Sequence, residues 1–163
     1  MTNIEELLAV LHSADIHFVI IGGVAARIRG SAYQTNDLAI CYERSKENIL
    51  KLANALEPFH PRLRGAPENL PFHFDPPTIL TGLNFTLVTD LGDLDVLGEV
   101  GGIGTYKHMD DLAGEVEIAD MKCRVLYIDA LIASKKFAGR KKDEPVVIEL
   151  EAIKELLATR QVP

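Results

Sequence analysis

Three aspartates have types and spacing that could support chemistry in this 163-residue chain. Asp37 precedes the apolar run 38–42, whereas Asp93 and Asp95 stand two residues apart in a later apolar segment. Side chains alternate across a strand, so Asp93 and Asp95 share a face, and an adjacent strand beginning at Asp37 would bring three carboxylates together. Magnesium prefers such oxygens, and two metal ions about 4 Å apart support phosphoryl or nucleotidyl transfer. The pattern predicts a Mg²⁺ site, with capping of strand ends and turns as the alternative.

A glycine pair, Gly22-Gly23, follows the β-branched run 18–21. Without side chains, the backbone N–H groups of such a turn can approach a phosphate where a helix begins. The alternative is a plain turn. The glycines of residues 101–104 do not complete a dinucleotide-binding G-x-G-x-x-G pattern, because Lys107 occupies the last position.

Basic residues gather between positions 122 and 142, where seven lysines and arginines accompany a single acid. On a chain with a formal charge of −7, such a segment favours a local anion site. Lys135 suits a triphosphate, and Arg140 could clamp a phosphate through two hydrogen bonds. The alternative is a helix whose C-terminal turn is stabilised by cations.

These candidates must be positioned by the strands and helices that the apolar pattern predicts. Apolar residues at helical spacing over 4–11 predict a first helix, and Ser45 is expected to cap another. The expected elements then run in this order: strand 18–21, helix 24–28, strand 38–42, helix 45–56, strands 85–88 and 94–97, a hairpin over 116–127, helix 129–138 and a C-terminal helix over 143–159. We expect an α/β (α+β) fold, a mixed sheet flanked by helices, in a single domain over 1–163.

A proline-rich segment, 58–77, interrupts this pattern with six of the eight prolines. An extended loop is predicted there, and a connection of this length inside a compact domain is often functional. Arg62 and Arg64 make it a candidate acceptor or partner surface, and a well-packed lid is the other interpretation.

The overall composition excludes several classes of protein. A net charge of −7 argues against nonspecific coating of nucleic acid, which needs a basic face. No apolar run is long enough to span a membrane, and the acidic N-terminus is unlike a secretory signal, so we expect a cytoplasmic protein. Cys41 and Cys123 are expected to be buried free thiols, and the five histidines form no metal-binding pattern.

Taken in order, these stretches resemble the nucleotidyltransferase superfamily, the DNA polymerase β-like fold, over about residues 18–157. In that family a strand leads to Gly-Gly or Gly-Ser, as at Gly22-Gly23, and a Thr-x-Asp-x-Asp strand follows, as at 35–39. A third carboxylate comes from a later strand, as at Asp95, and residues 135–143 look like a helix ending common among small bacterial members near abortive-infection type toxins.

The resemblance implies a nucleoside triphosphate as substrate or ligand, Mg²⁺ as cofactor and transfer of a nucleotidyl group to an unidentified acceptor. Asp95 or Asp93 would then be the base for the acceptor hydroxyl. Combined with the residue pattern, it assigns these roles: catalysis to Asp37 and Asp95, metal binding to Asp37, Asp93 and Asp95, and nucleotide binding to Gly22, Gly23, Thr35, Lys135 and Arg140.

One position departs from the family pattern, because Ala39 stands where the second aspartate normally bridges both metal ions. Three interpretations stay open. Asp93 replaces the missing ligand, for which Glu43 is a poorer substitute four residues further along; or Ala39 is an introduced change; or the protein binds nucleotide or a protein partner without catalysis, as in a toxin–antitoxin type pair.

Overall fold

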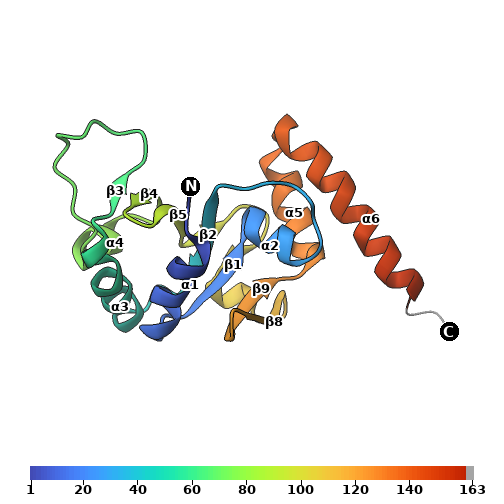
Figure 1. Cartoon of the computed structure of the whole chain (residues 1–163), viewed down its shortest axis with the longest axis horizontal. Coiled ribbons are helices and arrows are strands. Elements are labelled where there is room, and N and C mark those ends of the chain that lie inside the picture. The colour runs from blue at the N-terminus through green and yellow to red at the C-terminus, as the bar shows by residue number, and fades with distance from the viewer. Residues whose placement is uncertain (161–163) are drawn as a thin grey trace.

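The structure is a computed structural model that describes residues 1–160, a mixed β-sheet flanked by helices (Figure 1). Within this range the main sheet has seven strands in the order β3-β4-β5-β2-β1-β9-β8. Their bounds are β1 (Phe18–Ile21), β2 (Asp37–Tyr42), β3 (Arg62–Leu63), β4 (Asn84–Thr89), β5 (Gly92–Leu97), β8 (Ala113–Ile118) and β9 (Met121–Leu126). A second sheet pairs β6 (Glu99–Val100) with β7 (Gly104–Thr105). The predicted α/β class with a mixed sheet is confirmed.

Helices pack around this sheet, and the last of them lies beyond it at one end of the molecule (Figure 1). They are α1 (Ile4–Ser13), α2 (Gly22–Ile28), α3 (Lys46–Leu56), α4 (Pro76–Thr81), α5 (Ile128–Ala138) and α6 (Glu144–Arg160), with 3-10 turns η1 (Glu57–Phe59), η2 (Tyr106–Met109) and η3 (Lys141–Asp143). Helix α1 contacts α3, β2 and β9, whereas α2 packs against β1, β2 and α5. Helix α5 packs in turn on α6, which forms the right-hand end of the molecule in Figure 1.

The centre of the sheet is formed by strands with different neighbours on each side. Strand β1 runs antiparallel to β2 and parallel to β9, and β2 runs parallel to β5. All four residues of β1 are buried, as expected for a strand covered on both faces. In β2 only the first residue, Asp37, is not fully buried, so its polar side chain lies where the strand enters the sheet.

Local signals account for most of the element boundaries. The Ser45 side chain accepts a hydrogen bond from the Asn48 N–H at 3.2 Å, which confirms the predicted cap of α3. Residues Asp90 and Leu91 form the tight turn between β4 and β5, and Gly92 follows it with a φ of 118°. The turn predicted at the glycine pair falls on Gly22, with a φ of 65°, and α2 includes both glycines rather than starting at Val24.

The core is a continuous set of apolar side chains from the central strands and from α1, α3 and α5. Cys41 and Cys123 are buried free thiols, as predicted, and burial raises the pKa of Cys41 to about 12. Among the helices of residues 1–160, none combines the length and the apolar character that a membrane span requires.

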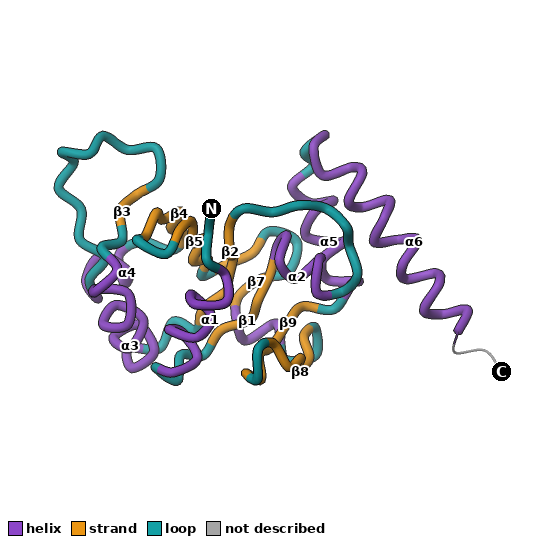
Figure 2. The backbone as a smooth tube through the Cα atoms, viewed as in Figure 1, coloured by secondary structure: helices purple, strands orange, loops and turns teal. Residues whose placement is uncertain are grey.

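The proline-rich segment contains more regular structure than the sequence predicts. It includes η1 and β3 and ends in the first turn of α4, with a long loop between β3 and α4 (Figure 2). Strand β3 pairs with β4 through Arg62 and Leu63, and the Arg64 N–H donates to the Thr86 carbonyl at 2.9 Å. This part of the segment is therefore an edge strand of the main sheet.

Candidate functional site

The register between β2 and β5 determines which carboxylates meet. Asp37 lies opposite Asp93, and Ala39 lies opposite Asp95. Because alternate residues share a face, Asp37, Ala39, Asp93 and Asp95 all belong to the same face of the sheet. The two predicted catalytic residues, Asp37 and Asp95, are thus diagonal neighbours on adjacent strands. Ala39 lies next to both of them on the same face.

Asp95 is held in an environment that opposes its ionisation. Its side chain is only 19% exposed. Burial, followed by hydrogen bonding and charge repulsion from Asp37, raises its pKa to about 6, although the Arg64 guanidinium acts in the opposite direction. Asp95 therefore retains its proton to a higher pH than an aspartate usually does.

This raised pKa predicts how stability changes with pH in metal-free buffer. The folded chain retains a proton on Asp95 that the unfolded chain has lost, so the contribution of Asp95 to the free energy of unfolding should fall as the pH rises from about 4 to about 6. Urea unfolding in the presence of a chelator, compared between the unmodified chain and Asp95→Asn, measures this contribution. Over this pH range the free energy of unfolding of Asp95→Asn should fall less, or rise more, than that of the unmodified chain, and identical pH profiles would contradict the assignment.

The glycine pair packs directly against the acidic strand. A Cβ on Gly22 would lie 3.2 Å from the Ala39 Cβ, and a Cβ on Gly23 would lie 2.7 Å from the Thr35 Oγ1. The Thr35 hydroxyl also lies 3.3 Å from a carboxylate oxygen of Asp37. Thr35 therefore links the glycine turn to the first carboxylate, and Gly23 leaves it the space to do so.

Lys135, on α5, and Arg140, shortly after that helix, line the same site and share a buried carboxylate. Asp143 is 7% exposed, accepts a hydrogen bond from Arg140 Nε at 2.7 Å and lies 3.7 Å from Lys135 Nζ. Sequence reasoning named both cations but gave Asp143 no role, although the acid closes the same 135–143 pattern. Asp143 fixes the two cations at one position.

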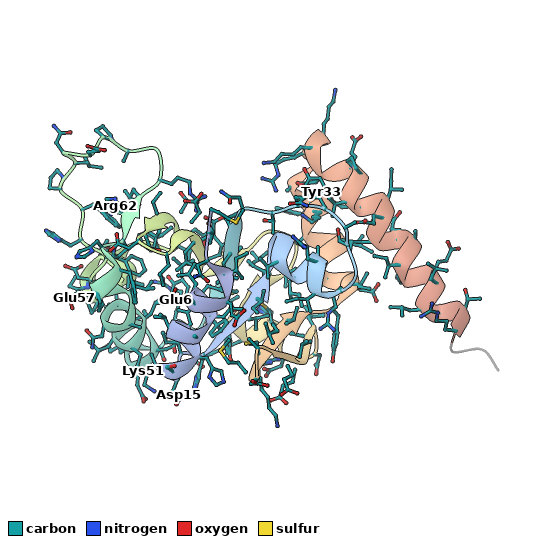
Figure 3. The ribbon with its side chains drawn as sticks, in the orientation of Figure 1. Glu6, Asp15, Tyr33, Lys51, Glu57 and Arg62 are labelled. Carbon is teal, nitrogen blue, oxygen red and sulfur yellow. The ribbon has the colours of Figure 1, made fainter. Side chains whose placement is uncertain are left out.

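A single cavity of about 410 Å³ joins these groups. Its lining includes every predicted site residue except Asp93: Gly22, Gly23, Thr35, Asp37, Asp95, Lys135 and Arg140. Tyr33, which sequence reasoning missed, also lines it and is 49% exposed. Figure 3 shows Tyr33 beside α5 and α6, where the Ala32 N–H donates to Glu149 of α6 at 3.0 Å. The only sequence signal for Tyr33 is an aromatic residue two positions before Thr35.

Asp93 faces an arginine rather than this cavity. Arg64, from the end of β3, places Nη2 2.8 Å from Asp95 Oδ1 and Nε 3.6 Å from Asp93 Oδ2. Sequence reasoning placed Arg64 on an acceptor surface or a lid and did not predict this contact. The role of Asp93 as a substitute metal ligand stays a prediction.

The carboxylates suit one magnesium ion better than two. Mg²⁺ is commonly held by one or two carboxylates together with substrate phosphates and water, which Asp37 and Asp95 can provide. Ala39, between them on the same face, offers no further carboxylate for a second ion. Within residues 1–160, no three histidine, cysteine or acidic side chains are grouped closely enough to hold a metal ion by themselves.

Comparison with known proteins agrees with this architecture. No protein-family model matches the chain, and no curated protein matches it in sequence. Among solved structures, the lincosamide antibiotic adenylyltransferase LnuA, with lincomycin bound, is similar with a TM-score of 0.59 and 15% identity, over 93% of this chain and 98% of that one. The antibiotic-resistance factor ANT(2'')-Ia, in complex with adenylyl-2''-tobramycin, gives a TM-score of 0.54 and 15% identity, over 96% and 95% of the two chains. A nucleotidyltransferase-like protein of Paracoccidioides brasiliensis gives 0.52 and 15%, over 94% and 74%. The chain therefore has the fold of the nucleotidyltransferases.

Proposed function

We propose that this protein binds a nucleoside triphosphate with Mg²⁺ and transfers its nucleotidyl group to an acceptor hydroxyl. The observation that carries the proposal is the single cavity in which a glycine turn, two carboxylates and two cations face one another. Lys135 and Arg140 would bind the phosphates with the backbone at Gly22-Gly23. Tyr33, which lines the same cavity, offers an aromatic surface on which the nucleobase could stack.

The carboxylates divide the chemistry between them. Asp37 and Asp95 would hold the ion, which supplies charge stabilisation to the phosphates when bound. Asp95 would accept the proton of the acceptor hydroxyl as the hydroxyl oxygen attacks the α-phosphate and pyrophosphate leaves. Without an ion the pKa of Asp95 is about 6, and a bound cation would lower it, so Asp95 would be ionised and able to accept a proton at neutral pH. Arg64 holds one oxygen of Asp95, so the remaining oxygen, with its two lone pairs, would both contact the ion and accept the proton.

A second candidate is nucleotide binding without transfer, as in a module that acts on a protein partner in a toxin–antitoxin type pair. Ala39 favours it, since the missing carboxylate normally bridges two metal ions. Both candidates keep the nucleotide cavity, so they differ in the chemistry and not in the ligand. For either, we propose a cytoplasmic location, with which two buried free thiols are consistent.

Nucleotide affinity tests what the candidates share. Lys135→Ala should weaken binding of a non-hydrolysable nucleoside triphosphate by about tenfold, because it removes one charge-assisted contact. Titration calorimetry in Mg²⁺ measures the change. Lys136→Ala is the matched control, since Lys136 is the next residue of α5 and pairs with Glu151 at 2.7 Å outside the cavity. Equal affinities for the two variants would contradict the proposed phosphate site.

Transfer is tested by release of pyrophosphate and labelling of an acceptor from α-labelled nucleotides. Lincomycin and tobramycin are sensible first acceptors, because structurally similar enzymes are seen with lincomycin and with adenylylated tobramycin. Labelling that is lost in Asp95→Asn supports the enzyme. Nucleotide binding with no transfer to a broad set of hydroxyl compounds supports the second candidate.

A further inference from the structure

Arg64 occupies an unusual position for a side chain of a peripheral segment. Its guanidinium reaches from the end of β3 across β4 to the carboxylates of β5, with Nη2 2.8 Å from Asp95 Oδ1 and Nε 3.6 Å from Asp93 Oδ2. We infer that Arg64 is a built-in cation that supplies the positive charge of a second metal ion, so that this site takes a single divalent cation.

The guanidinium is fixed by backbone groups as well as by the carboxylates. Its Nη2 donates to the Leu87 carbonyl at 2.9 Å, and the Arg64 N–H donates to the Thr86 carbonyl at 2.9 Å. Both acceptors belong to β4, the strand between β3 and β5. Arg64 Nε is buried and has no hydrogen-bond partner among the described residues, and the nearby Asp93 carboxylate compensates its charge. Arg64 is therefore held at the acidic site by backbone contacts to β4 as well as by the carboxylates of β5.

The charges balance for one divalent ion. Asp37, Asp93 and Asp95 bring three negative charges when ionised, and the positive charge of the Arg64 guanidinium leaves a balance of two negative charges. A position occupied by aspartate in the resembling family is neutral here, at Ala39. Arg64 also hydrogen-bonds to Asp95 Oδ1, so an ion must use the remaining oxygen of Asp95. A second ion would lack a carboxylate ligand at position 39 and would be repelled by the Arg64 guanidinium.

The inference deepens the proposed function by defining the metal that accompanies the nucleotide. It is tested without nucleotide, so that its failure is distinct from a failure to bind or transfer nucleotide. Mn²⁺ is titrated into the intact chain and the free ion is followed by its electron paramagnetic resonance signal. Unmodified protein should bind one Mn²⁺, and Arg64→Gln should bind it at least about tenfold more tightly, because a neighbouring positive charge is removed. Arg64→Lys, which keeps the charge, should stay close to the unmodified affinity.

Arg62→Gln is the matched control. Arg62 lies two residues earlier on β3 and is labelled on the edge strand in Figure 3. It contacts the His60 carbonyl and Asp90, and makes no ion pair with Asp93 or Asp95 among the described residues. Its affinity for Mn²⁺ should match that of the unmodified chain.

The double variant Ala39→Asp with Arg64→Gln should bind two Mn²⁺ ions, and Asp93→Asn should weaken the single site about tenfold by removing one negative charge. Thermal unfolding of each variant verifies that it is folded. Two equivalent Mn²⁺ sites in the unmodified protein, or equal affinities for Arg64→Gln and Arg62→Gln, would overturn the inference.

Discussion

Replacing Ala39 by aspartate should raise the rate of nucleotidyl transfer by about 100-fold or more. Residue 39 lies opposite Asp95 in the ladder, on the same face as Asp37, and lines the cavity in which we propose that the nucleotide binds. A carboxylate there would complete the three-aspartate arrangement of the resembling family and hold the metal more tightly. Charge stabilisation by a metal ion is worth several kcal/mol, and each 1.36 kcal/mol changes a rate tenfold. Steady-state pyrophosphate release at saturating Mg²⁺ measures the effect.

Ala39→Asn is the control for size, because it is close to aspartate in volume and adds no charge. Without metal, Ala39→Asp should be less stable than Ala39→Asn, since it places another negative charge beside Asp37 and Asp95. Addition of Mg²⁺ should reverse that order. If Ala39→Asp changes neither the rate nor the response of stability to Mg²⁺, residue 39 does not take the place of the family's second aspartate.

The parts of the site that follow from sequence are those governed by short-range rules. Strand alternation alone places Asp93 and Asp95 on one face, and the glycine pair marks the turn at Gly22. The pairing of β2 with β5 is different, because many residues separate the two strands and no local pattern specifies their contact. That neighbour relationship entered the sequence-based prediction as a condition, and the observed pairing, with Asp37 opposite Asp93 and Ala39 opposite Asp95, meets it.

Arg64 shows why other parts could not be predicted. Six prolines correctly indicate irregular backbone over 58–77, but they conceal a two-residue strand, β3. The contact of Arg64 with Asp95 depends on β3 joining the sheet beside β4, and it links two residues that are 31 positions apart in the sequence. A charged residue in a proline-rich segment is otherwise expected to be solvated, so sequence alone favours a surface or lid role.

The role of Asp143 could not be predicted for a related reason, because an acidic residue between lysines and the start of a helix is usually exposed. The structure instead buries it between Lys135, whose side chain is 12% exposed, and Arg140. Asp143→Ala should lower the free energy of unfolding by about 2–4 kcal/mol, because Lys135 is left as a buried charge with no counterion. Urea unfolding at neutral pH measures the loss.

The same change should weaken nucleotide binding, which separates Asp143 from an ordinary stabilising residue. Arg140 is half exposed and depends on Asp143 for its orientation toward the cavity, so losing the carboxylate releases it into many conformations. Glu151→Ala is the control: it breaks the exposed ion pair between Lys136 of α5 and Glu151 of α6, and such pairs contribute little to stability. Equal losses of stability in Asp143→Ala and Glu151→Ala would show that Asp143 does not compensate a buried charge. Loss of stability with unchanged nucleotide affinity would show that the cations bind phosphate without its help.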